Sequence, residues 1–182
     1  MKVYRRQARA VLLLLVVGCG TPRGGTGTQS WVDRLAGEAA LSSEMVNAPA
    51  DQVWSILPRV YEELGVNLSV IDSNRMWLGN TRFRLREING ERLSRFLDCG
   101  SGVGIVSYAD TYQVTMALLT GISEGVEGGS EVQTHFQAVA RPRAVSGNDL
   151  RCTSRGTLER RIVEIIVERV EMDSARESLT PL

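Results

Sequence analysis

Several residue types are scarce in this 182-residue chain, and each scarcity narrows what it can do. The single histidine, His135, argues against a histidine-rich metal site. The three cysteines include no C-x-x-C pair, which argues against thiol redox catalysis. The apolar run at residues 10–17 is far shorter than the roughly twenty residues that cross a bilayer. Lys2 is the only lysine. Residues 19–182 contain 17 arginines and 21 acidic residues, which gives a net charge near −4. A mildly acidic protein has no general electrostatic reason to bind nucleic acid.

The N-terminus contains the parts of an export signal in their usual order along the sequence. Small residues at Gly18-Cys19-Gly20 follow the apolar run, which is itself preceded by basic residues, namely Lys2, Arg5, Arg6 and Arg9. The residues Val16-Val17-Gly18-Cys19 resemble the lipobox of bacterial lipoproteins. This resemblance implies that residues 1–18 are a signal peptide and that Cys19 becomes the first residue, carrying the two or three fatty chains that stable anchoring needs. The alternative is an ordinary secretory signal with an incidental cysteine.

The resemblance also implies a compartment. In such lipoproteins a residue other than aspartate after the cysteine directs the protein to the outer membrane, and here that residue is Gly20. We therefore expect a cell-envelope protein at the periplasmic face of the outer membrane, provided that the host has two membranes. The stretch "GTPRGGTGTQ" is typical of a flexible tether, so residues 19–40 are expected to link the anchor to one domain at 41–172, followed by a polar tail at 173–182.

Once Cys19 is assigned to lipid, Cys99 and Cys152 remain. An exported protein lies where disulfides persist, so we expect these two cysteines to form one. Their loop of about 54 residues corresponds to roughly 4 kcal/mol in the chain-entropy model. The alternative is a pair of buried thiols. In either case the role is structural rather than catalytic.

The first core element is a helix near the start of the domain. Apolar residues recur there at helical spacing and include Val53, Trp54, Leu57, Val60, Tyr61 and Leu64. Gly65 is suited to end this helix. Pro58 removes a backbone donor within it, so we expect a kink or two joined short helices.

From residue 66 the apolar period changes to two, which predicts antiparallel strands. The expected strands lie at 66–72, 75–88, 91–99, 109–122 and 131–142. Asn89-Gly90 predicts a tight hairpin turn, and residues 123–131 turn the chain in a second hairpin. A loop is expected at 141–156, and Thr157 then starts an amphipathic helix. The expected fold is α+β of helix-grip type: a curved antiparallel sheet of about five or six strands packed on the C-terminal helix.

Two stretches resemble known helix-grip proteins. The residues "VNAPADQVWSIL" (46–57) resemble the opening of START-like domains, in which a small strand leads through Ala-Pro into a helix carrying Val-Trp. The residues "LPRVYEELGVNLSVIDSNRMWLGN" (57–80) resemble the C-subunit lipoproteins of the outer-membrane β-barrel assembly machine. The resemblance covers about residues 44–80 and the general shape of the last helix. It implies the helix-grip fold and a role beside that machine, and it carries over no catalytic motif.

Three features that could bear chemistry have simpler interpretations. The residues "DCGSGVG" (98–104) lack the Lys-Ser/Thr of a phosphate-binding loop. His135 alternates with core residues, which predicts an exposed histidine on the polar face of its strand, and no serine motif accompanies it. A group of glutamates lacks the spacing of calcium loops, and comprises Glu124, Glu127 and Glu131. We therefore expect no enzyme activity, no metal and no cofactor.

Two candidate sites remain. Arg82, Arg84 and Arg86 form a stripe that could contact lipid headgroups, cell-wall anions or an acidic protein partner; the alternative is an ordinary solvated face. Further arginines could extend the stripe, namely Arg75, Arg92 and Arg95. Trp54 and Trp77 could line a groove between sheet and helix, or simply fill the core.

These expectations give two hypotheses. In the first, the protein is a lipid-anchored, non-catalytic interaction or scaffold module in outer-membrane assembly or maintenance, attached to the membrane and binding an envelope protein. In the second, it is a periplasmic carrier that holds an apolar small molecule in the sheet–helix groove. An apolar internal cavity on the order of a few hundred Å³ favours the carrier. A filled core with an exposed apolar patch favours the scaffold.

Overall fold

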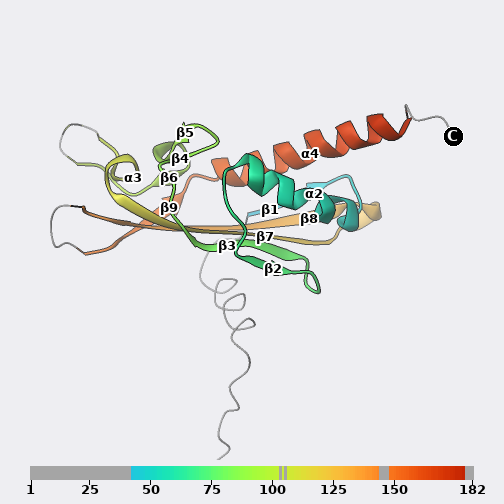
Figure 1. The fold of residues 1–182 in the computed structure, drawn as a ribbon, viewed down its shortest axis with the longest axis horizontal. Helices are drawn as coiled ribbons and strands as arrows, with labels where there is room; N and C mark the ends of the chain where they lie inside the picture. Colours follow the sequence, from blue (N-terminus) through green and yellow to red (C-terminus); the bar gives the residue numbers. More distant parts are fainter. Residues whose placement is uncertain (1–41, 103, 105, 144–147, 179–182) are drawn as a thin grey trace, which may run out of the picture.

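The computed structural model describes residues 42–102, 104, 106–143 and 148–178. The predicted signal peptide, Cys19 and the tether therefore lie outside the described residues. Within the described residues the chain is α+β, as expected, with an antiparallel sheet and two long helices that both lie on the same side of it (Figure 1).

The main sheet has seven strands in the order β2-β3-β7-β8-β9-β6, and β1 also pairs with β8. Its strands are β1 (Ser42–Val46), β2 (Val70–Asp72), β3 (Trp77–Phe83), β6 (Leu97–Asp98), β7 (Gln113–Glu124), β8 (Ser130–Arg141) and β9 (Leu150–Ser154). β1 and β9 pair with opposite halves of β8, because Ser42 lies opposite Thr134 and Cys152 opposite Ala138. The sequence predicted five or six strands, and β9 was wrongly expected to be part of a loop.

Both predicted hairpins are present. β7 and β8 pair along their full lengths, from Gln113–Arg141 to Glu124–Ser130. Asn89 and Gly90 both have positive φ, 49° and 72°, as a two-residue hairpin turn requires. That turn joins only β4 (Glu87–Ile88) to β5 (Glu91–Arg92), so this hairpin is short and stands apart from the main sheet. The expected strand at 91–99 is interrupted by the 3₁₀ turn η1 (Leu93–Arg95).

The two main helices are α2 (Ala50–Glu63) and α4 (Thr157–Ser178). Shorter turns are α3 (Tyr108–Thr111) and η2 (Val126–Gly128). α2 continues through the exposed Pro58, so it is one helix rather than two joined short ones. It ends as predicted, since the Gly65 amide donates to the Glu62 carbonyl and the Val66 amide to the Tyr61 carbonyl, at 3.0 and 2.9 Å.

The core lies between the sheet and the helices. Large side chains from both layers are at most 1% exposed, including Leu57 and Tyr61 of α2, Leu118 of β7, and Ile162 and Ile166 of α4. The Tyr61 hydroxyl lies 3.0 Å from Thr120 Oγ1, which pairs two buried polar groups across the layers. At the surface the Glu63 carboxylate joins the helices by accepting from Arg169 Nη2 at 2.7 Å.

The predicted disulfide is confirmed. Cys152 lies in β9, and Cys99 directly follows β6, the strand that pairs with β9. Both half-cystines are buried. The bridge therefore fastens the last strand of the sheet to a segment that lies 53 residues earlier in the chain.

The C-terminal helix is longer than expected. α4 runs to Ser178, past the predicted domain boundary at residue 172. Its buried residues recur at helical spacing and comprise Leu158, Ile162, Ile165 and Ile166. Of the helices in the described part of the chain, none combines the length and the apolar composition needed to cross a membrane.

Candidate functional site

The predicted arginine stripe lies where β3 leaves the sheet. β3 pairs with β7 as far as Phe83 and Met116, with a register shift just before that pair. Arg82 is therefore still in β3, whereas Arg84 and Arg86 lie in the segment that leads away to β4. All three are exposed. They form no single strand face, because the chain departs from the sheet between them.

Two adjacent pockets open at this departure point. The first, called the arginine pocket below, has a volume of about 340 Å³ and is lined by Arg84, Arg86, Asp110, Gln113 and Arg143 together with apolar residues. The second has a volume of about 240 Å³ and shares Arg84 and Gln113 with the first. Figure 1 shows α3 and the β4–β5 hairpin at the same end of the sheet. The concave surface is thus built by the ends of β3, β7 and β8 and by the segments around them.

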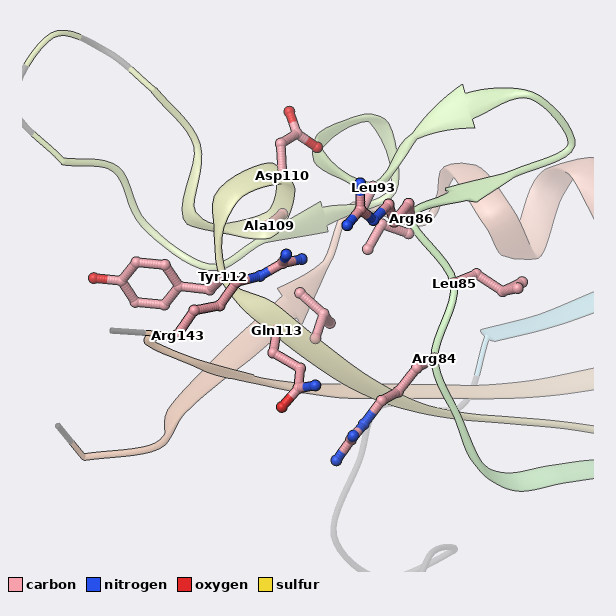
Figure 2. A pocket seen from close by; sticks show the side chains of 10 residues that line it. Arg84, Leu85, Arg86, Leu93, Ala109, Asp110, Tyr112, Gln113 and Arg143 are labelled. Carbon is pink, nitrogen blue, oxygen red and sulfur yellow. The ribbon is translucent and has the colours of Figure 1, made fainter. Parts of the chain in front are cut away.

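Figure 2 shows how the charged side chains of the arginine pocket are directed. The guanidinium groups of Arg86 and Arg143 point into the pocket from opposite sides. Arg84 points away from them, and its Nε donates to Thr115 Oγ1 at 3.0 Å. The Tyr112 ring also points away and stacks on Tyr108, with ring centroids 4.4 Å apart.

The carboxylates near these arginines accept hydrogen bonds from other groups of the protein. Asp110 accepts a hydrogen bond from the Ser94 amide at 2.9 Å and points out of the pocket in Figure 2. In the second pocket Asp149 accepts from Arg141 Nε and Nη2 at 2.6 and 2.8 Å. These hydrogen bonds hold the pKa of Asp149 below its usual value. Of the arginines that line the two pockets or lie in the predicted stripe, Arg82, Arg84, Arg86 and Arg143 form no ion pair with a carboxylate of the described residues.

The stripe is extended by different residues from those expected. Arg75, Arg92 and Arg95 line neither pocket, and Arg95 is paired with Glu91 at 2.8 Å. Arg141 and Arg143 take their place, at the end of β8. The signal that could have identified them is the register of the β7–β8 hairpin, which places Arg141 opposite Gln113.

The two candidate groove tryptophans lie on opposite faces of the sheet. Trp54, in α2, packs against the core on the helix side. Trp77 alternates with the buried core residue Leu78 in β3, and its ring lies across Gly121 on the outer face, so close that a Cβ on Gly121 would lie 2.2 Å from it. The two side chains therefore share no groove.

The prediction that His135 is exposed is wrong. It lies on the predicted face of β8, away from Phe136, but it is only 1% exposed. Leu119, its partner in register on β7, is just as buried. Neither ring nitrogen meets a hydrogen-bond partner in good geometry, and burial lowers the pKa of the imidazole, with Gln137 close enough to offset part of that shift. The outer face of the sheet is thus partly apolar and packed rather than uniformly solvated.

The remaining candidates are placed as follows. Glu131 accepts hydrogen bonds from the hydroxyl groups of Ser43 and Ser123, so it belongs to the sheet surface. Within the described ranges no three His, Cys, Asp or Glu side chains come together as metal ligands.

The chain matches no model of a protein family, no curated protein and no solved structure.

Proposed function

We propose that this protein is a lipid-anchored cell-envelope protein whose single domain binds another envelope component and catalyses no reaction. The observation that carries the proposal is the order of features at the N-terminus, in which basic residues, a short apolar run and Val16-Val17-Gly18-Cys19 follow one another. Acyl chains on Cys19 would hold the protein at the periplasmic face of the outer membrane. There it would serve outer-membrane assembly or maintenance.

The disulfide supports this compartment. Cys99 and Cys152 are bonded, and such bonds persist in oxidising compartments such as the periplasm and are rare in the cytosol. The proposal includes a helix-grip fold. Its support is the long helix α4, which lies with α2 on one side of a mostly antiparallel sheet (Figure 1).

The exposed arginines are the proposed contact surface. Arg82, Arg84 and Arg86 lie at one end of the sheet, and Arg143 joins them there. Arginine is the cation best suited to recognise carboxylates and phosphates, because its planar fork can donate two hydrogen bonds at once. The carrier hypothesis has less support, since Trp54 and Trp77 lie on different faces and the large side chains between sheet and helices are fully buried.

Metabolic labelling with a radioactive fatty acid tests the anchor. The native chain, expressed in its own host, is expected to incorporate label and to sediment with the outer membrane. The Cys19→Ser variant is expected to lose both the label and the membrane association. A Cys99→Ala, Cys152→Ala double variant is the matched control, because it removes the other cysteines and should retain the label. Equal labelling of the native chain and Cys19→Ser would contradict the proposal.

A further inference from the structure

We propose that the arginine pocket binds the phosphate group of an organic phosphate monoester. The inference rests on the proposed function only in treating this surface as a binding surface. It does not depend on acylation of Cys19. The shared chemistry is a dianionic phosphate on an organic body, and the ligand is either a lipid headgroup or a soluble ester.

The charge arrangement is the first argument. Arg86 and Arg143 point into one pocket from opposite sides, and neither has a carboxylate partner among the described residues. Two facing cations repel each other, and the repulsion is relieved when an anion lies between them. Asp110 also lines the pocket, but its Oδ1 accepts from the Ser94 amide and it forms no ion pair with Arg86 or Arg143. The pocket therefore has a place for an external anion.

The number of donors favours phosphate over carboxylate. Each guanidinium fork can donate two parallel hydrogen bonds to two oxygens of one oxyanion. A carboxylate has two oxygens and one negative charge. A phosphate monoester has three terminal oxygens and a charge of about −1.5 to −2 at neutral pH, which matches two converging arginines. Where a single carboxylate meets a single arginine in this region, as Asp149 meets Arg141, the two oxygens occupy one fork.

The apolar part of the lining favours an ester over inorganic phosphate. Leu93, Ala109 and Val114 are buried and Leu85 is half-buried, and all four line the arginine pocket. The pocket volume of about 340 Å³ is in the range of small-molecule sites, about 300–1,000 Å³. Of these four side chains only the half-buried Leu85 offers apolar surface that an organic body can cover while its phosphate meets Arg86 and Arg143. The Gln113 side chain points away from both guanidinium groups in Figure 2 and also lines the second pocket, so it takes no part in this contact.

Calorimetric titration of the full chain, as extracted in a neutral detergent, tests the inference. The probes are inorganic phosphate, glycerol 3-phosphate and dihexanoyl phosphatidic acid, in a phosphate-free buffer of low ionic strength. We expect both esters to bind more tightly than inorganic phosphate. The Arg86→Gln, Arg143→Gln variant is expected to bind them at least about tenfold more weakly, because two charge-assisted contacts are lost. The Arg86→Lys, Arg143→Lys variant should fall between, since it keeps the charge but loses the forks.

The matched control is Arg75→Gln with Arg92→Gln. It removes the same charge from exposed arginines that lie in neither pocket and have no ion pair among the described residues, so it should bind like the native chain. Circular dichroism of each variant reports whether it is folded.

Tighter binding of dihexanoyl phosphatidic acid than of glycerol 3-phosphate assigns the site to a lipid headgroup, and equal binding assigns it to a soluble ester.

Three results would overturn the inference. The first is that neither ester binds; the second is that the Gln pair and its control bind equally. The third is that a glutamate-rich peptide binds more tightly than either ester, which would make the site a carboxylate site for a protein partner. None of these results affects fatty-acid labelling of Cys19, so failure here is distinguishable from failure of the proposed function.

Discussion

Reduction of the Cys99–Cys152 disulfide is expected to lower the free energy of unfolding by about 4 kcal/mol. The bond closes a loop between residues that are 53 positions apart, and a loop of that length restricts the unfolded chain by roughly this amount in the chain-entropy model. Both cysteines are buried, so after reduction the two thiols remain among the same neighbours. Most of the loss should therefore come from the cross-link rather than from changed packing.

Guanidinium unfolding of the full chain, followed by circular dichroism with and without a phosphine reductant, measures this loss. The reduced protein should unfold at a lower denaturant concentration. It should also show a larger dependence on denaturant, because its unfolded chain exposes more surface. The Cys19→Ser variant should give the same difference, since that residue is not part of the bond. A difference below about 1 kcal/mol between oxidised and reduced protein would refute the reasoning, which takes the chain-entropy value as the main contribution.

Three further predictions concern buried residues. Burial lowers the pKa of His135 from its ordinary value of 6.5, so the unfolded chain binds a proton below pH 6.5 more readily than the folded one. The free energy of unfolding should therefore be highest above pH 6.5 and should fall below that pH by at most about 1.4 kcal/mol per pH unit. Urea unfolding between pH 5 and 7.5 should show this fall for the native chain and not for His135→Gln. Tyr61→Phe leaves Thr120 Oγ1 without a partner and should lower the free energy of unfolding, measured with denaturant, by about 1–2 kcal/mol. The Tyr61→Phe, Thr120→Val double variant should lose less than Tyr61→Phe alone, because no buried hydroxyl is then unpaired. Gly79→Ala would place a Cβ 2.2 Å from the Leu118 carbonyl oxygen and should lower the stability by about 3 kcal/mol or more in thermal melting; an unchanged melting temperature would exclude this contact.

Local patterns in the sequence predict the elements that form from local signals. The helical apolar stripe identifies α2, whose buried residues include Val53, Leu57 and Val60. Asn89-Gly90 identifies a hairpin turn, and alternation identifies the long strands β7 and β8. The disulfide follows from cysteine counting once Cys19 is assigned elsewhere. Each of these inferences uses residues that act within one element or one turn.

The features that were missed depend on contacts between distant segments. β9 is five residues long, "LRCTS", and becomes a strand through its pairing with β8 and β6, which no local pattern reports. Alternation gives the correct face for His135 but not its burial, because that depends on what packs on the outer face of the sheet. The arginine pocket likewise combines Arg84 and Arg86 with Arg143, which lies more than fifty residues later. Only the hairpin register brings Arg143 to the same end of the sheet.

The most direct test of the central claim is the intact mass of the protein extracted in detergent from its own membranes. A lipid-anchored envelope protein should have a chain that begins at Cys19 and carries the mass of two or three acyl chains. A chain that still begins at Met1, or one processed without acyl mass, would contradict the anchor on which the proposed function depends.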